Sequence, residues 1–146
     1  MATNDAPLYK GITISSPENN APVISKQYRG ISTVANPKSF KIYDINCIKQ
    51  DIINHFYIRQ GEKLENPEFG TIIWDVLFDP LTDSLKQAII DNVQDIIDYD
   101  PRVTADQVVV NEYESGIQIE CTLIYLDYSI AETMRLQFDQ DNGLVA

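Results

Sequence analysis

The sequence predicts an α+β domain of two layers, in which about three helices pack on one face of an antiparallel β-meander. Apolar residues recur at helical spacing over residues 44–97, whereas they alternate with polar residues over 117–138. Helical segments followed by a run of strands are typical of an antiparallel sheet covered on one face. At 146 residues, one domain can bury roughly two thirds of its unfolded surface.

Residues 1–38 are expected to form an extended N-terminal arm, and residues 39–146 to form the α+β body. The arm carries four of the seven prolines and shows no sustained period. Within it, Tyr9–Thr13 (Tyr-Lys-Gly-Ile-Thr) and Tyr28–Ser32 (Tyr-Arg-Gly-Ile-Ser) echo each other. Two explanations stay open: similar docking strands laid on a partner, or coincidence.

The first two helices follow a short strand expected over residues 39–42. Asp44 is an acceptable N-cap for the first helix, whose apolar residues then recur at helical spacing: Ile45, Ile48, Ile52 and Phe56. Residues 56–60 look more like strand, and Gly61 turns the chain. Thr71 can cap a short second helix over residues 72–78.

The third helix has the clearest pattern in the chain. It is expected to begin at Asp79-Pro80 or Leu81-Thr82, since proline is tolerated in a first turn. Its apolar stripe comprises Leu85, Ala88, Ile89, Val93, Ile96 and Ile97. Pro101 disfavours helical geometry at the residue before it, so the helix should end near Asp98 or Tyr99.

Three strand-like runs follow. Val108–Val110 leads to a turn at Ser115-Gly116, and Ile117–Tyr125 then alternates apolar with polar residues, as expected for a sheet with one buried face. The third run is Thr133–Phe138. Because no later strand is expected to cover it, this run should present unpaired N–H and C=O groups.

Two short polar signatures lie at joints between elements, where residues usually hold a partner or a site. In the first, Asn66–Thr71, Phe69 is expected to pack into the body and Gly70 to relieve a backbone constraint, while Glu68 offers a carboxylate. In the second, Tyr99–Val103, Pro101 stiffens the corner and aims the next side chain.

That next side chain is Arg102, whose guanidinium is always charged and offers a planar fork of donors. It suits bidentate pairing with a partner's carboxylate or capping of exposed carbonyls. An intradomain salt bridge with one of the chain's many acids is the equally open alternative.

The order of these features resembles a known family. An amphipathic helix, Gly61 with Pro67–Thr71, Pro80–Thr82, a helix ending in an acid-Pro-Arg corner and a β-meander look like the baseplate wedge protein that starts the tail sheath in contractile-tailed phages. The same family includes the small baseplate subunit of type VI secretion systems. The resemblance covers about residues 39–138. The family's usual Glu-Pro-Arg is here Asp100-Pro101-Arg102, one methylene shorter.

The resemblance implies a non-catalytic virion protein of the tail baseplate, assembled in the host cytoplasm. Its partners would be other wedge proteins with their helical core bundle, the tail sheath protein and tail tube or hub proteins. The implied docking residues are Asp100, Pro101 and Arg102, with Glu68, Phe69 and Gly70 in the turn. The first sheath subunits would join by strand exchange, for which the edge at Thr133–Phe138 is available.

Composition argues against several other classes of protein. Eleven basic and twenty-two acidic side chains give a net charge of −11, which repels nucleic acid. No apolar run approaches the roughly 20 residues that span a bilayer, and the N-terminus does not resemble a signal peptide, so a cytoplasmic origin is expected. Cys47 and Cys121 lack metal or redox spacing and are expected to be small buried hydrophobes, so neither a metal nor a cofactor is expected.

The rival from another class is a cell-wall glycoside hydrolase carried by the tail. Such an enzyme needs two carboxylates facing across a cleft, one with a raised pKa. Four acids in the turn region are candidates: Glu62, Glu65, Glu68 and Asp79. Acids are abundant throughout this chain, however, so their number is close to chance. His55, the single histidine, is expected to be a satisfied surface or edge residue and not a triad member.

Overall fold

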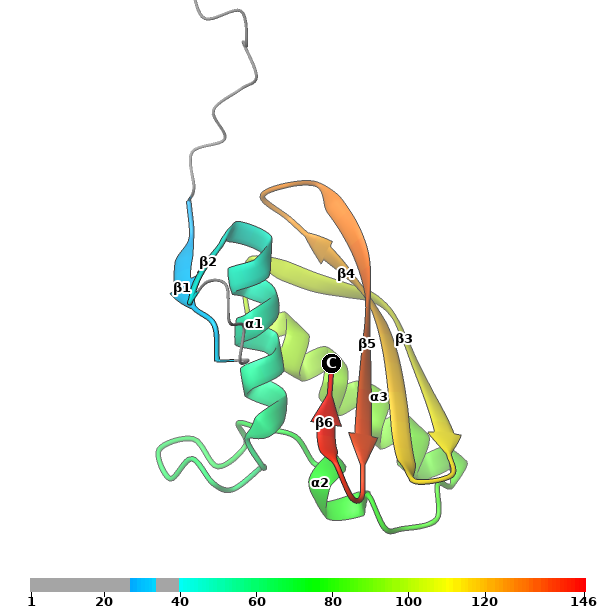
Figure 1. The fold of residues 1–146 in the computed structure, drawn as a ribbon. Helices are drawn as coiled ribbons and strands as arrows, with labels where there is room; N and C mark the ends of the chain where they lie inside the picture. Colours follow the sequence, from blue (N-terminus) through cyan, green and yellow to red (C-terminus); the bar gives the residue numbers. More distant parts are fainter. Residues whose placement is uncertain (1–26, 34–39) are drawn as a thin grey trace, which may run out of the picture.

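The computed structural model describes residues 27–33 and 40–146 (Figure 1). Residues 1–26 and 34–38 of the predicted arm lie outside this part of the chain, and so do the segment Tyr9–Thr13 and Ser39, the first residue of the predicted body. The elements in chain order are β1 (Arg29–Ile31), β2 (Lys41–Tyr43), α1 (Asp44–Tyr57), α2 (Ile73–Val76), α3 (Asp83–Asp98), β3 (Val103–Tyr113), β4 (Gly116–Tyr125), β5 (Ile130–Asp139) and β6 (Gly143–Val145).

The α+β prediction is confirmed. Strands β3, β4, β5 and β6 form one antiparallel sheet in that order, and α3 packs against β3 (Figure 1). The predicted turn at Ser115-Gly116 joins β3 to β4, with Tyr113 opposite Gly116. A Cβ on Gly116 would lie 1.9 Å from the carbonyl oxygen of Phe138, so this close approach requires glycine.

The predicted boundaries hold best for α3. Helix α2 is shorter than expected, and Ile72, not Thr71, is its N-cap. Thr82 caps α3 by accepting the N–H of Leu85 at 3.3 Å. Helix α1 begins at Asp44 but continues to Tyr57, so the strand expected over residues 56–60 is wrong: only an isolated bridge joins Arg59 to Thr71. Asp44 does not act as the N-cap, because Tyr43 occupies that position and the Asp44 carboxylate accepts N–H groups from the arm.

The expected uncovered edge is partly covered, which corrects the prediction for Thr133–Phe138. After β5 the Asp139 carboxylate accepts the N–H groups of Asp141 and Asn142, and Gly143 adopts a φ of 77°. This tight turn folds the chain back as β6, which pairs with Gln137–Asp139. Residues 130–136 of β5 have no strand beside them on that side within the described chain.

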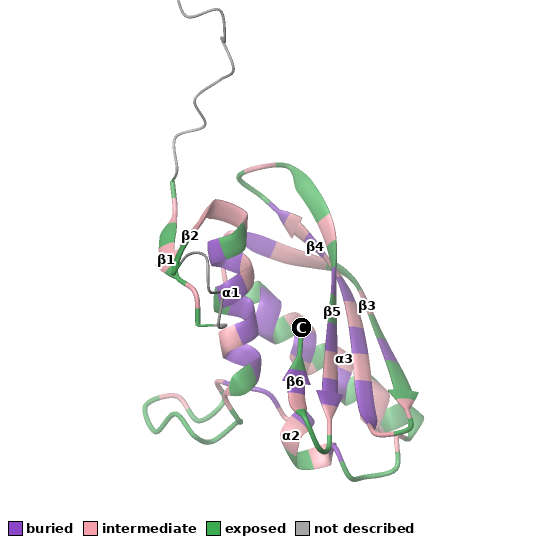
Figure 2. Ribbon diagram, in the orientation of Figure 1, coloured by how far each residue is buried: buried purple, intermediate pink, exposed green. Residues whose placement is uncertain are grey.

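The core lies between the helices and the inner face of the sheet (Figure 2). Burial alternates along β4, as the sequence pattern predicts. Trp74 of α2 donates its indole N–H to the carbonyl of Phe56 at 2.8 Å and packs edge-on against Phe138, so α2 closes one end of the core. Both cysteines are buried free thiols, as expected, and burial raises the pKa of Cys121 to about 12.

Candidate functional site

The turn motif is a loop whose two ends are tied together. The N–H of Thr71 donates to the carbonyl of Ile58 at 2.8 Å, and the N–H of Gln60 donates to the carbonyl of Thr71 at 3.1 Å. Gly70 lies in this crossing with a φ of 116°, and a Cβ there would meet the Arg59 backbone at 2.7 Å. The structure therefore explains Gly70 as a backbone requirement, as the sequence predicts.

Phe69 lies in an aromatic cluster with His55 and Tyr99. Its ring stacks on the His55 ring with centroids 3.7 Å apart, and Tyr99 meets both rings edge-on. Phe69 is thus packed into the body as expected. The neighbouring Glu68 is exposed, and its backbone carbonyl accepts a hydrogen bond from Gln60 Nε2 at 3.2 Å.

The expectation for His55 as a satisfied surface or edge residue is wrong. Its side chain is buried at 8% exposure, and its Nε2 atom has no hydrogen-bond partner within the described residues. The reason is Phe69, which folds back on the last turn of α1 and covers the imidazole. Burial, with a smaller effect of the Lys63 charge, lowers the pKa of His55 and favours the neutral ring.

The acid-Pro-Arg corner forms a tight ion pair. Asp100 Oδ1 accepts from the Arg102 backbone N–H at 3.0 Å and from Arg102 Nε at 2.8 Å, while Oδ2 accepts from Nη2 at 2.5 Å. Pro101 between them is exposed. Burial alone would raise the pKa of Asp100, but the hydrogen bonds and charge of Arg102 outweigh it and lower that pKa.

Arg102 also joins segments that are distant in the sequence. Its Nη2 donates to Asp51 of α1 at 2.7 Å, and its guanidinium lies 4.9 Å from the ring centroid of Tyr28. The intradomain salt bridge that the sequence left open is therefore present. The hydrogen bond to Asp100, and to a smaller extent the one to Asp51, raises the pKa of Arg102 above its usual value, so the guanidinium stays charged.

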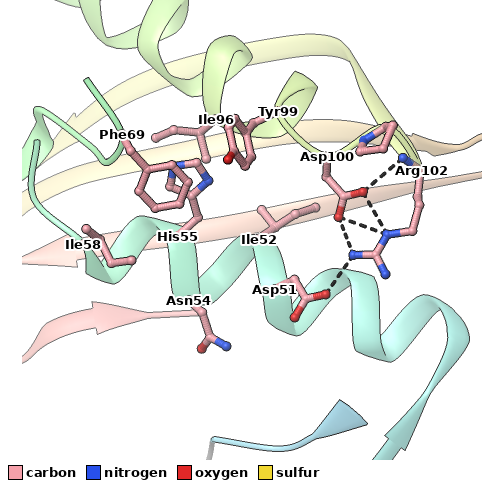
Figure 3. Close-up of a pocket in the computed structure, with 11 residues that line it drawn as sticks. Asp51, Ile52, Asn54, His55, Ile58, Phe69, Ile96, Tyr99, Asp100 and Arg102 are labelled. Carbon is pink, nitrogen blue, oxygen red and sulfur yellow. Dashed lines mark hydrogen bonds and ion pairs between the residues drawn. The ribbon is translucent and has the colours of Figure 1, made fainter. Parts of the chain in front are cut away.

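The two signatures meet at one pocket between α1 and α3 (Figure 3). It has a volume of about 420 Å³, and eleven side chains line it. Its walls are mostly apolar or aromatic: Ile52, His55, Ile58, Phe69, Ile96, Tyr99 and Pro101. The ion pair of Asp100 and Arg102, with Asp51, lies at one end (Figure 3).

A second, more polar pocket adjoins the aromatic cluster and shares His55, Phe69, Ile96 and Tyr99 with the first. Its further lining includes Glu68, Gly70 and Asp95. All six residues predicted as partner-binding therefore line one pocket or the other. Sequence reasoning missed His55 and Asp51, whose contacts depend on tertiary packing and leave no periodic signal.

The three candidate hydrolase acids with a described environment, Glu62, Glu68 and Asp79, do not line one common pocket. Glu62 accepts the backbone N–H of Arg59, Glu68 borders the polar pocket, and Asp79 lines a different pocket beside the β3–β4 turn. In the described ranges 27–33 and 40–146, no group of three or more potential metal ligands is found. Within the same ranges, no helix is both long enough and apolar enough to span a membrane.

The fold and the site together describe a small α+β domain whose mostly apolar pocket lies between the turn motif and the acid-Pro-Arg corner. The family model for baseplate wedge protein gp25 matches residues 44–134, more than half of the chain, and the chain belongs to this family. It is thus a structural component of a phage tail baseplate, and so of the virion.

A solved structure has a similar fold. A Geobacter sulfurreducens protein, named provisionally as a tail lysozyme, superposes with a TM-score of 0.55 at 19% identity. The match covers 63% of this chain and 86% of that one, and at this identity it concerns the fold alone. Among curated proteins, none matches this chain.

Proposed function

We propose that this protein is a non-catalytic wedge subunit that docks on a neighbouring wedge protein through the pocket between α1 and α3. The observation that carries the proposal is that this pocket joins Phe69 of the turn motif to Asp100, Pro101 and Arg102 of the corner. Apolar walls with a few fixed polar groups are typical of binding sites. The Asp100 and Arg102 side chains already pair with each other. We therefore assign them mainly to the shape of the pocket rim, and only secondarily to direct contacts with the partner.

Lysozyme-like chemistry has little support in this geometry. A glycosidase needs an acid whose pKa is raised, facing a second carboxylate across the substrate. The pocket carboxylates Asp51 and Asp100 instead share the guanidinium of Arg102, and the pKa of Asp100 is lowered. The name of the Geobacter protein therefore does not transfer to this chain.

The docking proposal is tested with two exposed aromatic residues. Tyr99 is 60% exposed and lines the pocket, whereas Phe78 is 72% exposed and lies outside it beside α2. Aromatic residues at the centre of an interface typically contribute about 2 kcal/mol or more, a factor of roughly thirty. Tyr99→Ser should therefore weaken binding of the neighbouring wedge protein about thirtyfold in calorimetry, while Phe78→Ser should leave it unchanged. Equal affinities for both variants would refute docking at this pocket.

A second part of the proposal concerns the sheath. The uncovered stretch of β5, residues 130–136, offers main-chain groups to an extended strand of the first sheath subunit. The other edge strand, β3, carries an irregularity between Ala105 and Gln107, and such bulges hinder strand addition. The register of β5 with β4 is continuous, so β5 is the better acceptor.

The alternation of hydrogen bonds along β5 shows which of its N–H groups are available to an added strand. The N–H of Gln140 donates to the carbonyl of Ser115, and this pair continues the register of β4 with β5. The backbone N–H and C=O groups of even-numbered β5 residues therefore point toward β4, and those of odd-numbered residues point away from it. The backbone of Gln137 is therefore paired with Val145 of β6, whereas the backbone N–H of Arg135 points to the uncovered side of β5. Proline at Gln137 would therefore disturb β6, and Arg135 is the cleaner position for a test.

Arg135→Pro should block sheath polymerisation on assembled baseplates while leaving wedge assembly intact, because proline removes the N–H. Arg135→Ala is the matched control, since it removes the exposed ion pair with Glu120 but keeps the N–H. Normal sheath on baseplates that carry the folded proline variant would contradict strand addition at β5.

A further inference from the structure

Strand β1 and the residue on either side of it turn every second residue toward the body of the domain. Tyr28, Gly30 and Ser32 are partly buried, whereas the residues between them are exposed. Among the described residues, the contacts of this segment include β2 together with Phe40, Asp44, Cys47, Arg102 and Asp127. We call this set the β1 docking surface.

Tyr28 makes the most extensive contacts with this surface. Its hydroxyl donates to Asp127 Oδ2 at 2.5 Å, and its ring lies against the guanidinium of Arg102. Its backbone N–H donates to Asp44 Oδ1 at 3.1 Å, and its carbonyl accepts the N–H of Asp44 at 3.0 Å. A tyrosine is thus recognised at both its ring and its hydroxyl.

Gly30 and Ser32 meet further requirements of the surface. A Cβ on Gly30 would lie 2.7 Å from Cys47 Sγ, closer than carbon and sulfur atoms pack, so a larger side chain would have to displace the Cys47 thiol or push the strand off α1. The N–H of Ser32 donates to the carbonyl of Phe40 at 2.8 Å, which continues the pairing with β2. The surface therefore selects for tyrosine at the first inward position and glycine at the second.

The chain contains this pattern twice. In Tyr9–Thr13, the residues that correspond to Tyr28, Gly30 and Ser32 are a tyrosine, a glycine and a threonine, so the inward-facing chemistry is kept at all three. The one exposed position that differs exchanges one basic residue for another, Arg29 for Lys10. We propose that the β1 docking surface also binds Tyr9–Thr13 of the same chain, in place of Tyr28–Ser32.

Loop closure decides which segment is preferred. The loop between Ser32 and Phe40 contains seven residues, 33–39, whereas exchange would create a loop of 26 residues, 14–39. Loop-closure probability falls as about the 3/2 power of loop length, so Tyr9–Thr13 should occupy the surface about sevenfold less often. The exchange releases Tyr28–Ser32 for other contacts. This inference does not depend on the proposed docking role of the pocket.

The Cys47 thiol reports whether the surface is occupied. Cys47 is 6% exposed beneath Gly30, and Cys121 is fully buried in the sheet, so a maleimide should label Cys47 when the strand leaves. Valine at either glycine blocks one occupant, which gives three full-length variants: Gly11→Val, Gly30→Val and the double variant. A Cys47→Ser chain shows the background labelling.

If both segments bind, Gly11→Val should label at nearly the wild-type rate. Gly30→Val should label about eightfold faster than wild type, because only the segment with the longer loop remains. The double variant should label at least tenfold faster again. Equal rates for Gly30→Val and the double variant would overturn the proposal, and so would protection of Gly30→Val that falls on dilution, which would indicate a second copy.

A second pair of variants covers the case in which valine at position 30 disturbs the body itself. Tyr28→Ala and the double variant Tyr9→Ala with Tyr28→Ala weaken the same two occupants by loss of the ring and hydroxyl contacts. Far-UV circular dichroism checks that each chain is folded. Faster labelling of the double variant than of Tyr28→Ala supports exchange, and equal rates overturn it.

Discussion

Replacing Arg102 by alanine should destabilise the domain before any partner is added. The guanidinium is 22% exposed and donates to Asp100, which is 14% exposed, and to Asp51, which is 52% exposed. A partly buried, charge-assisted pair contributes about 2 kcal/mol, whereas an exposed pair contributes less than about 1 kcal/mol. Contact with the Tyr28 ring adds roughly 0.5 kcal/mol.

Together, these contributions predict that Arg102→Ala lowers the free energy of unfolding, measured with urea, by about 3 kcal/mol. For a domain of this size, that loss lowers the unfolding midpoint by roughly 6–12 °C. Asp51→Asn should cost less than about 1 kcal/mol, because it removes the charge only from the exposed partner.

Arg135→Ala is the matched control, since its single ion pair with Glu120 at 2.9 Å is exposed and should contribute less than about 1 kcal/mol. A loss below about 1 kcal/mol for Arg102→Ala would refute the view that Arg102 holds the corner together. Such a stable variant that nevertheless failed to bind the neighbouring wedge protein would assign Arg102 mainly to the interface.

Three further predictions concern the turn motif and its neighbours. Gly70→Ala should cost about 3 kcal/mol in urea unfolding, because it adds a clash with the Arg59 backbone to a φ of 116°, whereas Gly61→Ala, with a φ of 92° and open space, should cost about 1 kcal/mol. Phe69→Ala should lower the free energy of unfolding by about 2 kcal/mol, because it removes the stacking on His55. Glu68→Gln should lower it by less than about 0.5 kcal/mol, because Glu68 is exposed, so equal losses would reveal a contact of the Glu68 carboxylate. The folded state lowers the pKa of His55, so the unfolded chain binds its proton first as pH falls below about 6.5. The free energy of unfolding should therefore fall between pH 7 and 5.5 in the wild type and fall less in His55→Phe; identical pH profiles would contradict this.

The long elements could be predicted from sequence because their signals are local and repeated. The stripe from Leu85 to Ile97 and the capping by Thr82 identify α3, and the alternation over Ile117–Tyr125 identifies β4. The family resemblance also rests on motifs at the ends of such elements. Each of these patterns is present before any tertiary contact forms.

Short elements were missed for the opposite reason. Strands β1 and β6 have three residues each, too few to show a period, and each depends on a partner strand. The same limit applies to the site. Pairing of Arg102 with Asp51 and covering of His55 by Phe69 both depend on how α1 packs, so the sequence could predict the corner and the turn but not the pocket between them.

The hairpin that adds β6 to β5 has a consequence for strand addition. In the strand addition proposed above, an incoming strand along β5 would pair with residues 130–136 and then meet Val145, where β6 already pairs with Gln137. Seven residues correspond to roughly 23 Å of extended chain. A one-residue slip would turn every side chain of the added strand to the opposite face, so a physical end point at β6 helps to define a single register. In the proposed strand addition, β6 therefore limits the length of the added strand as well as covering one end of the β5 edge.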